Sequence, residues 1–352
     1  MVSRAHVMTV DLLKQVGPLS DEQVVWINEI YGPVDAKYHS PAYVRHQFVD
    51  NPFRRSVNVF AVADGRVVGH CGVIPFHARR NGETFVAGKL EALAVDSGHR
   101  GRRAEDGGSL ATDILSCLYP FAVENGIEAV FGLAPPPVAR IHMRAGCHQV
   151  PTNAPAYTCI ADATTFGAKE ASLKRRVGAR GLGWMQRALV ETAGLTGRTA
   201  SQLERPRDED AGLASRIDNR GGWTVSGGDA WEWFASSGVL HGLELPGRGG
   251  SRALLRLDDS QAATVQIVSW RPQRDGLSSA FRLLAAVTKL ARAHHAPTVR
   301  FQPWRGDAHE AILARACRLA GFVRRPEADL LLYPDGPSVD DVRLTPFFYV
   351  TF

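Results

Sequence analysis

The residues with the clearest chemical potential lie between Leu90 and Leu115 (LEALAVDSGHRGRRAEDGGSLATDIL). The segment begins with strand-like alternation, passes through a basic turn that starts at Gly98, and continues into an apolar helical stretch after Ser109. Glycines let backbone N–H groups approach an anion, and a helix N-terminus adds unpaired donors and a partial positive charge. This order predicts a phosphate-binding turn. An ordinary surface connection with solvated basic residues is the alternative.

The strand before the turn carries an acidic residue. Simple alternation places Glu91 on the same face as Leu93 and Val95. The spacing of the glycines matches neither GxxxxGK[ST] nor GxGxxG, so a P-loop and a dinucleotide-binding fingerprint are both excluded. The turn therefore belongs to another class of phosphate site.

The turn resembles the pyrophosphate-binding turn of the GNAT superfamily of N-acetyltransferases. In that family a strand ends in V-x-P-x-x-R-G-x-G, and backbone amides bind the pyrophosphate of acyl-CoA. Val95 and the run Arg100–Arg102 match this pattern. Arg103 stands where the family has its next glycine, and residues 104–106 form an insertion. The resemblance assigns acyl-CoA binding to Leu93, Ala94, Val95, Arg100, Gly101, Arg102, Arg103, Gly107, Gly108 and Ser109.

The resemblance also implies catalytic residues. GNAT enzymes transfer an acyl group from a CoA thioester directly to an amine, which requires a base for the amine and an acid for the leaving thiolate. Glu91 is the implied base, because it lies nine residues before Arg100, where many family members carry a glutamate. His142 is the implied acid, because it lies four residues before Gly146, where the family usually has a tyrosine. The alternatives are a glutamate paired with an arginine at a strand edge and a histidine on a helix surface.

The order of elements around the turn also fits this family, over about residues 24–160. Asp64-Gly65-Arg66 indicates a hairpin turn, and Pro120 is expected to kink the helix after the phosphate turn or end it early. The expected strands lie at residues 57–63, 67–76, 84–95 and 127–133, with a helix over residues 108–126 and a short helix carrying His142.

The second half repeats the plan of the first without close sequence identity. Strands are expected at 253–257, 264–270, 298–302 and 329–333, and helices at 277–293 and 311–322. No RGxG pattern precedes the helix at 277–293, so this half resembles a GNAT domain that has lost its phosphate turn. An unrelated α/β domain is the alternative. The predicted domains are residues 1–164, a helical and charged connector at 165–222, and a degenerate GNAT-like domain at 223–352.

Composition limits the class of protein. A chain of 352 residues is long enough for two domains, and its net charge of +5 suits an anionic ligand such as CoA. No basic helix with interleaved aromatic residues is present, which argues against nucleic acid as a partner. Five widely spaced cysteines favour buried thiols over disulfides or a metal site, and no metal is expected. The absence of an apolar membrane-length run or signal-like start favours the cytoplasm.

The sequence thus predicts an α/β (α+β) protein with two GNAT-like domains, each a mostly antiparallel mixed, twisted sheet flanked by helices. The expected activity is transfer of an acyl group, acetyl in the first instance, from acyl-CoA to a primary amine of a small molecule such as an amino sugar or an antibiotic or biosynthetic intermediate. One alternative is an acyltransferase that uses an acyl carrier protein docked on the Arg100–Arg103 patch. The other is a non-catalytic binding protein. Acyl chain length, acceptor and oligomeric state are left open.

Several aromatic and histidine side chains could line an acceptor site or simply belong to the core. Both interpretations are kept open at this point. These residues are Tyr31, Tyr38, Tyr43, Trp223, Trp231, Trp233, His70 and His77.

Overall fold

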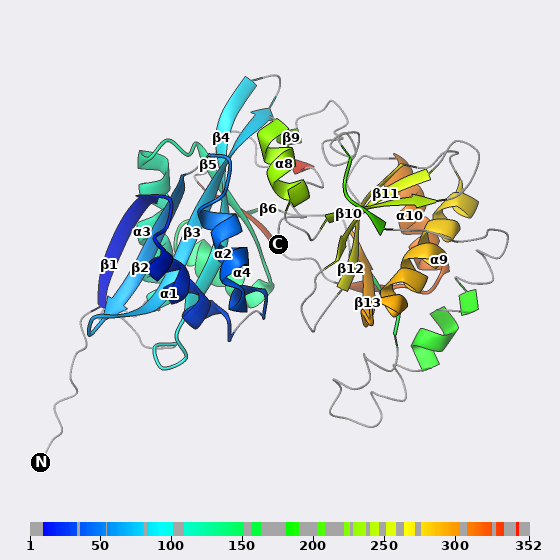
Figure 1. Ribbon diagram of the computed structural model, residues 1–352, viewed down its shortest axis with the longest axis horizontal. Coiled ribbons are helices and arrows are strands. Elements are labelled where there is room, and N and C mark those ends of the chain that lie inside the picture. Colours follow the sequence, from blue (N-terminus) through cyan, green and yellow to red (C-terminus); the bar gives the residue numbers. More distant parts are fainter. Residues whose placement is uncertain are drawn as a thin grey trace, which may run out of the picture. The chain divides into compact units, whose positions relative to one another are not determined.

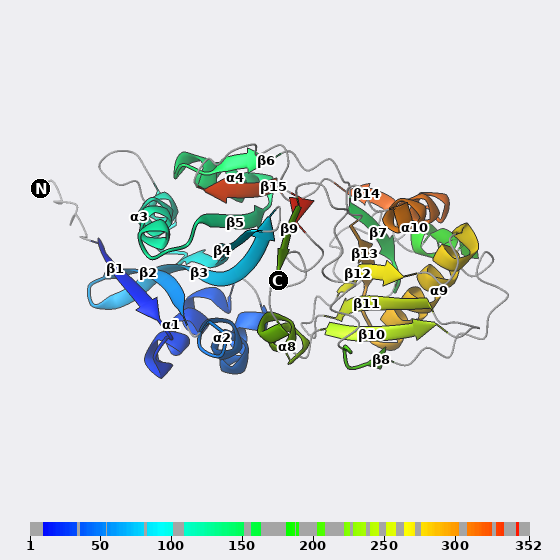
Figure 2. The same ribbon diagram turned by 90° about the horizontal axis from the view of Figure 1, so that it is seen from above.

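A computed structural model of the chain describes residues 10–33, 36–53, 55–80, 83–100, 109–150, 156–162, 181–186, 188–189, 203–207, 222–225, 228–236, 240–245, 251–257, 264–271, 276–302, 308–325, 329–333 and 343–344. These residues form two compact units, drawn in Figures 1 and 2. Each unit is built around its own mixed sheet with helices on its faces.

The sheet of the first unit has the strand path β1-β2-β3-β4-β5-β15-β6. All neighbours on this path are antiparallel except β4 and β5. Figure 2 shows α3 and α4 on one face of the sheet and α1 and α2 on the other. The elements are β1 (Val10–Gly17), α1 (Asp21–Tyr31), the 3-10 helix η1 (Ala36–His39), α2 (Pro41–Phe48), β2 (Ser56–Ala63), β3 (Arg66–Arg80), β4 (Glu83–Val95), α3 (Leu110–Glu124), β5 (Ala129–Ala134), α4 (Pro136–Arg144), β6 (His148–Val150) and β15 (Asp329–Tyr333).

The second unit has the same strand path, β8-β10-β11-β12-β13-β7-β14, and again only its fourth and fifth strands are parallel. This identity confirms two GNAT-like sheets, each with a main path of seven strands, and the predicted internal repeat. The elements are β7 (Ala156–Ile160), β8 (Leu203–Glu204), β9 (Gly222–Val225), α8 (Gly228–Ser236), β10 (Leu240–Leu245), β11 (Ser251–Leu257), β12 (Thr264–Arg271), α9 (Leu277–Ala293), β13 (Thr298–Phe301), α10 (Ala308–Leu319), β14 (Val323–Arg325) and β16 (Arg343–Leu344), which pairs with β9 in parallel.

The two units exchange one strand each. The sixth strand of the first sheet is β15, which comes from the far end of the chain and pairs with β5 and β6. The sixth strand of the second sheet is β7, which pairs with β13 and β14. Figure 2 shows this exchange as a red strand among green ones in the first unit and a green strand among orange ones in the second. The expectation that residues 329–333 belong to the second half is therefore wrong.

The predicted boundaries at residues 164 and 222 consequently do not separate the units. Residues 156–162 contribute to the second sheet, and Leu203 and Glu204, inside the expected connector, form its edge strand. A single boundary cannot describe this fold, because the first unit combines residues 1–151 with residues 328–340, which follow the main segment of the second unit.

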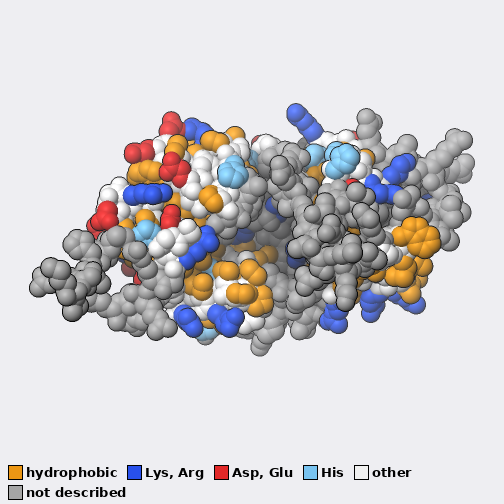
Figure 3. Space-filling view, turned by 90° about the horizontal axis from the view of Figure 1, so that it is seen from below, with side chains coloured by type: hydrophobic (Ala, Val, Ile, Leu, Met, Phe, Trp, Pro, Cys, Tyr) orange, Lys and Arg blue, Asp and Glu red, His pale blue; other side chains and the backbone are white. Residues whose placement is uncertain are grey.

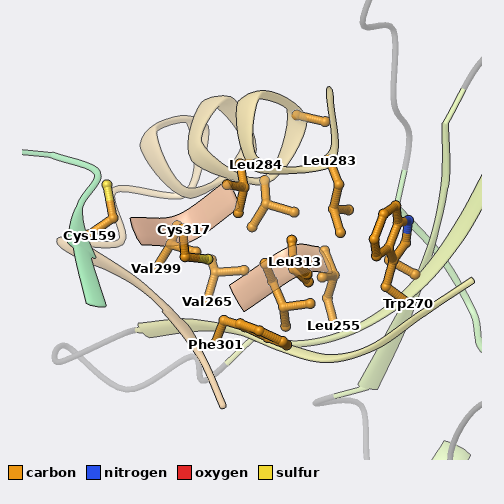
Figure 4. Close-up of a cluster of buried hydrophobic side chains, with 14 of the residues drawn as sticks. Cys159, Leu255, Val265, Trp270, Leu283, Leu284, Val299, Phe301, Leu313 and Cys317 are labelled. Carbon is orange, nitrogen blue, oxygen red and sulfur yellow. The ribbon is translucent and has the colours of Figure 1, made fainter. Parts of the chain in front are cut away.

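Each unit has its own apolar core. In the first unit, residues of α3 such as Ile114, Leu115 and Leu118 pack on β2, β3 and β4, and Leu331 of β15 belongs to the same cluster. In the second unit, α9 and α10 cover the sheet, and Figure 4 shows Leu283 and Leu313 from these helices meeting the strand residues. Burial of Leu331 in the first core contributes to the stability of the first unit.

Helix α3 runs through Pro120, so the alternative of an early end is wrong. Proline removes the N–H that would bond to the carbonyl of Ser116. Both Ser116 and Pro120 are exposed, so water can satisfy that carbonyl. The helix ends instead at Asn125 and Gly126, where Gly126 has a φ of 81°.

The hairpin between β2 and β3 forms at the Asp64-Gly65 turn that the sequence predicted. Asp64 and Gly65 have φ values of 52° and 74°, the left-handed pair that a tight turn between twisted antiparallel strands requires. Asparagine, aspartate and glycine tolerate this conformation best, which is why Asp-Gly marked the turn in the sequence.

The exchanged topology predicts which backbone amides lose protection from hydrogen exchange when either sixth strand is weakened. Truncating Leu331 to Ala should cost about 2–5 kcal/mol of unfolding free energy, because it removes fully buried side-chain volume from the first core. In hydrogen-exchange mass spectrometry, amides of β5 and β6 should then exchange faster than those of β13. The reciprocal variant is Cys159→Ala on β7, which should expose β13 and β14 instead. Faster exchange in β13 with Leu331→Ala would contradict the exchanged topology.

Candidate active site

Strands β4 and β5 separate part-way along their length. Their parallel pairing covers only Ala87–Lys89 against Ala129–Phe131. Beyond it, β4 continues to Val95 beside β3, whereas β5 continues to Ala134 beside β15. Among the described residues, no strand pairs with the β5-facing edge of β4 after Lys89. Backbone groups on this edge of β4 are therefore positioned to bond to a ligand.

A β-bulge lies just beyond this point. Gly72 of β3 pairs with Glu91, but His70 pairs with Ala94, so β4 carries one extra residue here. Ala92 has a φ of 57°, a conformation that costs a non-glycine residue free energy and persists only when the surrounding structure fixes it.

The bulge changes which side chains share a face, which corrects the sequence analysis. Leu93 and Val95 pack in the α3 cluster, as Leu90 does. Glu91 lies on the opposite face, against Tyr38. Alternation of period two predicted one common face, and the extra residue at the bulge reverses the phase.

Glu91 is buried and has two partners in the described structure. Lys89 Nζ lies 3.0 Å from Glu91 Oε2, and the Tyr38 hydroxyl donates a hydrogen bond to Glu91 Oε1. The exposed fractions of Lys89 and Glu91 are 3% and 7%. Desolvation, followed by the nearby Glu91 carboxylate, raises the pKa of Tyr38 well above its ordinary value. The phenol is thus held as a donor and the carboxylate as an acceptor.

Tyr38 belongs to a group of three tyrosines on the α1–α2 side of the sheet. Its ring centroid lies 4.2 Å from that of Tyr31 at the end of α1 and 5.2 Å from that of Tyr43 near the start of α2. Tyr38 is fully buried, and the other two are half-buried. For Tyr38, the structure shows both a core position and contact with the candidate base.

His70 is a buried neighbour of the bulge. Its Nε2 lies 3.1 Å from Asn58 Oδ1, and its ring meets Phe48 edge-on and lies tilted against Phe60. Burial lowers the pKa of His70 to about 3, so it is neutral near pH 7. His77, by contrast, is exposed and packs against Phe53.

His142 lies on the other face of the sheet, in the core beside α3. Its Nδ1 is 2.6 Å from the Tyr119 hydroxyl, and Tyr119 stacks on Tyr333 of β15 at 4.7 Å. The exposed fraction of His142 is 5%, so the alternative of a helix-surface histidine is wrong. Burial lowers its pKa to about 4, which makes the imidazole neutral at physiological pH. Its role as the acid stays a prediction.

The beginning of the predicted phosphate turn is ordered by its own hydrogen bonds. The Gly98 amide donates to Asp96 Oδ1 at 2.7 Å, and the amides of His99 and Arg100 donate to the Asp96 carbonyl. The Gly98 bond is the largest cause that lowers the pKa of Asp96. Arg100 Nε donates to the Val95 carbonyl at 2.8 Å. Arg100 thus folds back on the end of β4.

Ser109 is the N-cap of α3, and its hydroxyl accepts a hydrogen bond from the Thr112 amide. Leu93 is half-buried, and Ala94 and Val95 are buried next to β3. The structure therefore places the strand end and the helix start of the predicted site. The predicted binding residues Gly101, Arg102, Arg103, Gly107 and Gly108 lie outside the described residues and stay predictions.

The second unit repeats the split but not the acidic side chain. Its β12 and β13 pair only over Thr264–Ile267 against Thr298–Phe301, and the register of β12 also shifts near Leu255. The sequence of β12, TVQIVSWR, contains no carboxylate. Its connection to α9, residues 272–276, is also much shorter than the corresponding residues 96–109 of the first unit. Only the first unit thus combines the split with a candidate base.

Sequence reasoning missed the partners of Glu91. Lys89 lies two residues before Glu91, and this spacing alone places both on one face of β4. No such local signal links Glu91 to Tyr38, because more than fifty residues separate them and only the packing of η1 on β4 joins them.

Comparison with solved structures identifies the fold. A tandem GNAT protein from the clavulanic acid biosynthesis pathway matches 93% of this chain over 100% of its own, with a TM-score of 0.55 and 13% sequence identity. This chain has the tandem GNAT fold. A conserved protein from Enterococcus faecalis V583, described as a probable N-acyltransferase, also matches over 91% of this chain and 72% of its own, with a TM-score of 0.51 and 12% identity.

No protein-family model matches the sequence, and curated proteins give no significant match. The assignment of the tandem GNAT fold therefore rests on structural similarity and not on a sequence match. Within the described residues, no helix is both long and apolar enough to cross a membrane, and no group of three or more potential metal ligands occurs. On the face shown in Figure 3, Lys and Arg side chains of the described residues are interspersed with hydrophobic and acidic ones.

The buried Lys89–Glu91 pair makes a stability prediction. Replacing Lys89 by Met should lower the unfolding free energy by about 3–5 kcal/mol, because it leaves a buried carboxylate without its charged partner. The double variant Lys89→Met/Glu91→Gln should recover much of this loss, measured by urea denaturation. Equal stability of the single and double variants would show that the pair is not coupled in the folded protein.

Burial of His142 predicts how the stability of this protein depends on pH. The pKa of His142 is about 4 when folded and near 6.5 when unfolded, so the unfolded chain binds more protons between these values. Stability should therefore fall as pH drops from about 6.5 to about 4, and His142 should contribute up to about 3 kcal/mol of this loss. His142→Gln should flatten the dependence, measured by thermal unfolding across pH. A variant as acid-sensitive as the natural chain would contradict this assignment, with His77→Gln as the exposed control.

Proposed function

We propose that the first unit is an N-acyltransferase that moves an acyl group from acyl-CoA to a primary amine of a small molecule. The observation that carries the proposal is the place of Glu91, which lies two residues beyond the last parallel pair of β4 and β5 and next to the bulge. The unpaired edge of β4 offers backbone bonds to the thioester end of the donor. The carboxylate lies beside this edge and can receive the proton of the amine.

The other end of the donor would meet the turn between β4 and α3. In this proposal the pyrophosphate binds the backbone N–H groups of Gly101–Gly108 and the start of α3. Ser109 fixes the start of that helix through its cap. Arg100 is exposed and attached to the end of β4, where its charge adds to the attraction for an anion.

The acid that protonates the leaving thiolate is proposed to be His142. A neutral imidazole can pass on a proton only if it receives one at the same time, and the Tyr119 hydroxyl at 2.6 Å is its hydrogen-bonding neighbour. The second unit would then complete the fold without a donor site, because its β12 carries no carboxylate.

One observation favours a second candidate, a non-catalytic binding protein. Both oxygens of Glu91 already have partners, so the carboxylate is satisfied without any substrate. In this alternative the pair with Lys89 only stabilises the fold. A measurement of turnover distinguishes the acyltransferase from the non-catalytic binding protein.

The test is release of free CoA from acetyl-CoA with a panel of primary amines: glucosamine, ethanolamine, lysine and tyramine. The natural chain should release CoA, and Glu91→Gln should lower kcat about 10²–10⁴-fold while the KM for acetyl-CoA changes little. Glu83→Gln, on the exposed start of the same strand, is the matched control. Calorimetric binding of acetyl-CoA without turnover by any amine would support the non-catalytic candidate, and loss of both would remove the proposed donor.

A further inference from the structure

The contacts of Glu91 raise a question about the path of the proton. A base must reach the proton that it abstracts, directly or through one intervening group. Lys89 donates to Glu91 Oε2 at 3.0 Å and holds that oxygen with an opposite charge. Tyr38 donates to Oε1. Each carboxylate oxygen of Glu91 therefore already faces a protein donor, and a proton can reach Glu91 by way of one of them.

The two donors differ in what they can do next. Transfer of a proton from Lys89 to Glu91 would replace their ion pair by two neutral groups and so remove the charge complementarity that holds Oε2. A phenol that passes its proton to Glu91 can accept another at the same oxygen in the same step. Since burial and the Glu91 charge raise the pKa of Tyr38, its lasting ionisation is disfavoured, and a concerted transfer avoids it.

Tyr38 lies on the side of the sheet that carries α1 and α2. Tyr38 belongs to η1, between α1 and α2, and its ring lies between those of Tyr31 and Tyr43. Glu91 belongs to the sheet beneath. The half-buried Tyr31 and Tyr43 rings form the outer part of this group, and the Tyr38 hydroxyl forms its inner end against the carboxylate.

We infer that Tyr38 is a catalytic residue that relays the proton of the acceptor amine to Glu91. This inference rests on the proposed function and deepens it. As the amine nitrogen bonds to the thioester carbonyl carbon, its proton moves to the Tyr38 oxygen and the Tyr38 proton moves to Glu91 Oε1. The carbon–sulfur bond then breaks with its electron pair on sulfur, and the thiolate takes a proton from His142 while His142 takes one from Tyr119. The proton held by Glu91 passes to solvent and one from solvent returns to Tyr119, which restores all four groups. The products are an amide and free CoA, and no oxidant or reductant takes part.

The relay also defines the acceptor class. The group that touches the amine is a neutral phenol, backed by a carboxylate whose charge Lys89 already balances. Such a site offers little net attraction to a cation, and it favours an amine that arrives as the neutral base. Amines of low basicity, such as α-amino or aromatic amines, are thus the inferred acceptors, in preference to strongly basic alkylamines.

Tyr38→Phe gives opposite results for a relay and for a direct base. It keeps the ring but removes the hydroxyl that covers Glu91 Oε1. The relay predicts a kcat loss of about 10²-fold or more, similar to that of Glu91→Gln, with the KM for acetyl-CoA little changed. The double variant should be no slower than the slower single one, because the two residues act in one transfer. Direct action of Glu91 predicts a Tyr38→Phe rate within about threefold of the natural rate, since one carboxylate oxygen becomes available.

The assay uses CoA release from acetyl-CoA with 4-methylaniline and with ethanolamine, which are a weakly and a strongly basic amine. Tyr157→Phe, which removes a phenol oxygen from a buried tyrosine of the second unit, is the matched control. Near-natural kcat in Tyr38→Phe at unchanged thermal stability would overturn the relay while leaving the acyltransferase function intact. Preference for ethanolamine at equal pH would overturn the inferred acceptor class. Absence of CoA release from the natural chain with every amine would instead overturn the proposed function itself.

Discussion

The parallel ladder between β4 and β5 is short, and the site of the first unit depends on where it stops. After Lys89, β4 keeps its antiparallel partner β3, and β5 turns its other edge to β15. The extra residue at Ala92 then reverses the faces of β4, so that apolar side chains meet α3 and the carboxylate meets η1. One interruption of a sheet thus produces both an unpaired backbone edge and an oriented acidic group.

The buried polar groups beside this interruption are organised as pairs, as the low dielectric of a protein interior requires. Lys89 and Tyr38 satisfy Glu91, and Asn58 contacts His70 near the bulge. On the opposite face, Tyr119 satisfies His142. Each of these contacts joins residues from different elements, except the pair on β4. The polar network therefore depends on correct packing of α1, η1, α3 and α4 on the sheet.

The exchanged sixth strands connect this local chemistry with the whole chain. Tyr333, which stacks on Tyr119, and Leu331, which lies in the α3 core, both come from β15 near the end of the described residues. The first unit consequently cannot complete its core or the surroundings of His142 from its own continuous segment. The second unit takes its sixth strand, β7, from the start of its own main segment, residues 152–327. The folding of the two repeats is therefore linked, because the first unit needs a strand from beyond the second and the second uses the strand that follows β6 of the first.

The sequence by itself determined the elements and much of their order. Period-two and period-3.6 patterns predicted the central strands and helices such as Leu277–Ala293, because apolar periodicity reflects local geometry. Asp64-Gly65 marked its turn for the same local reason. The tertiary structure alone decided the bulge at Ala92, the contact of Tyr38 with Glu91 and the exchange of β7 and β15. These features arise from competition among distant segments for the same sheet edge and the same buried space, which no local pattern records.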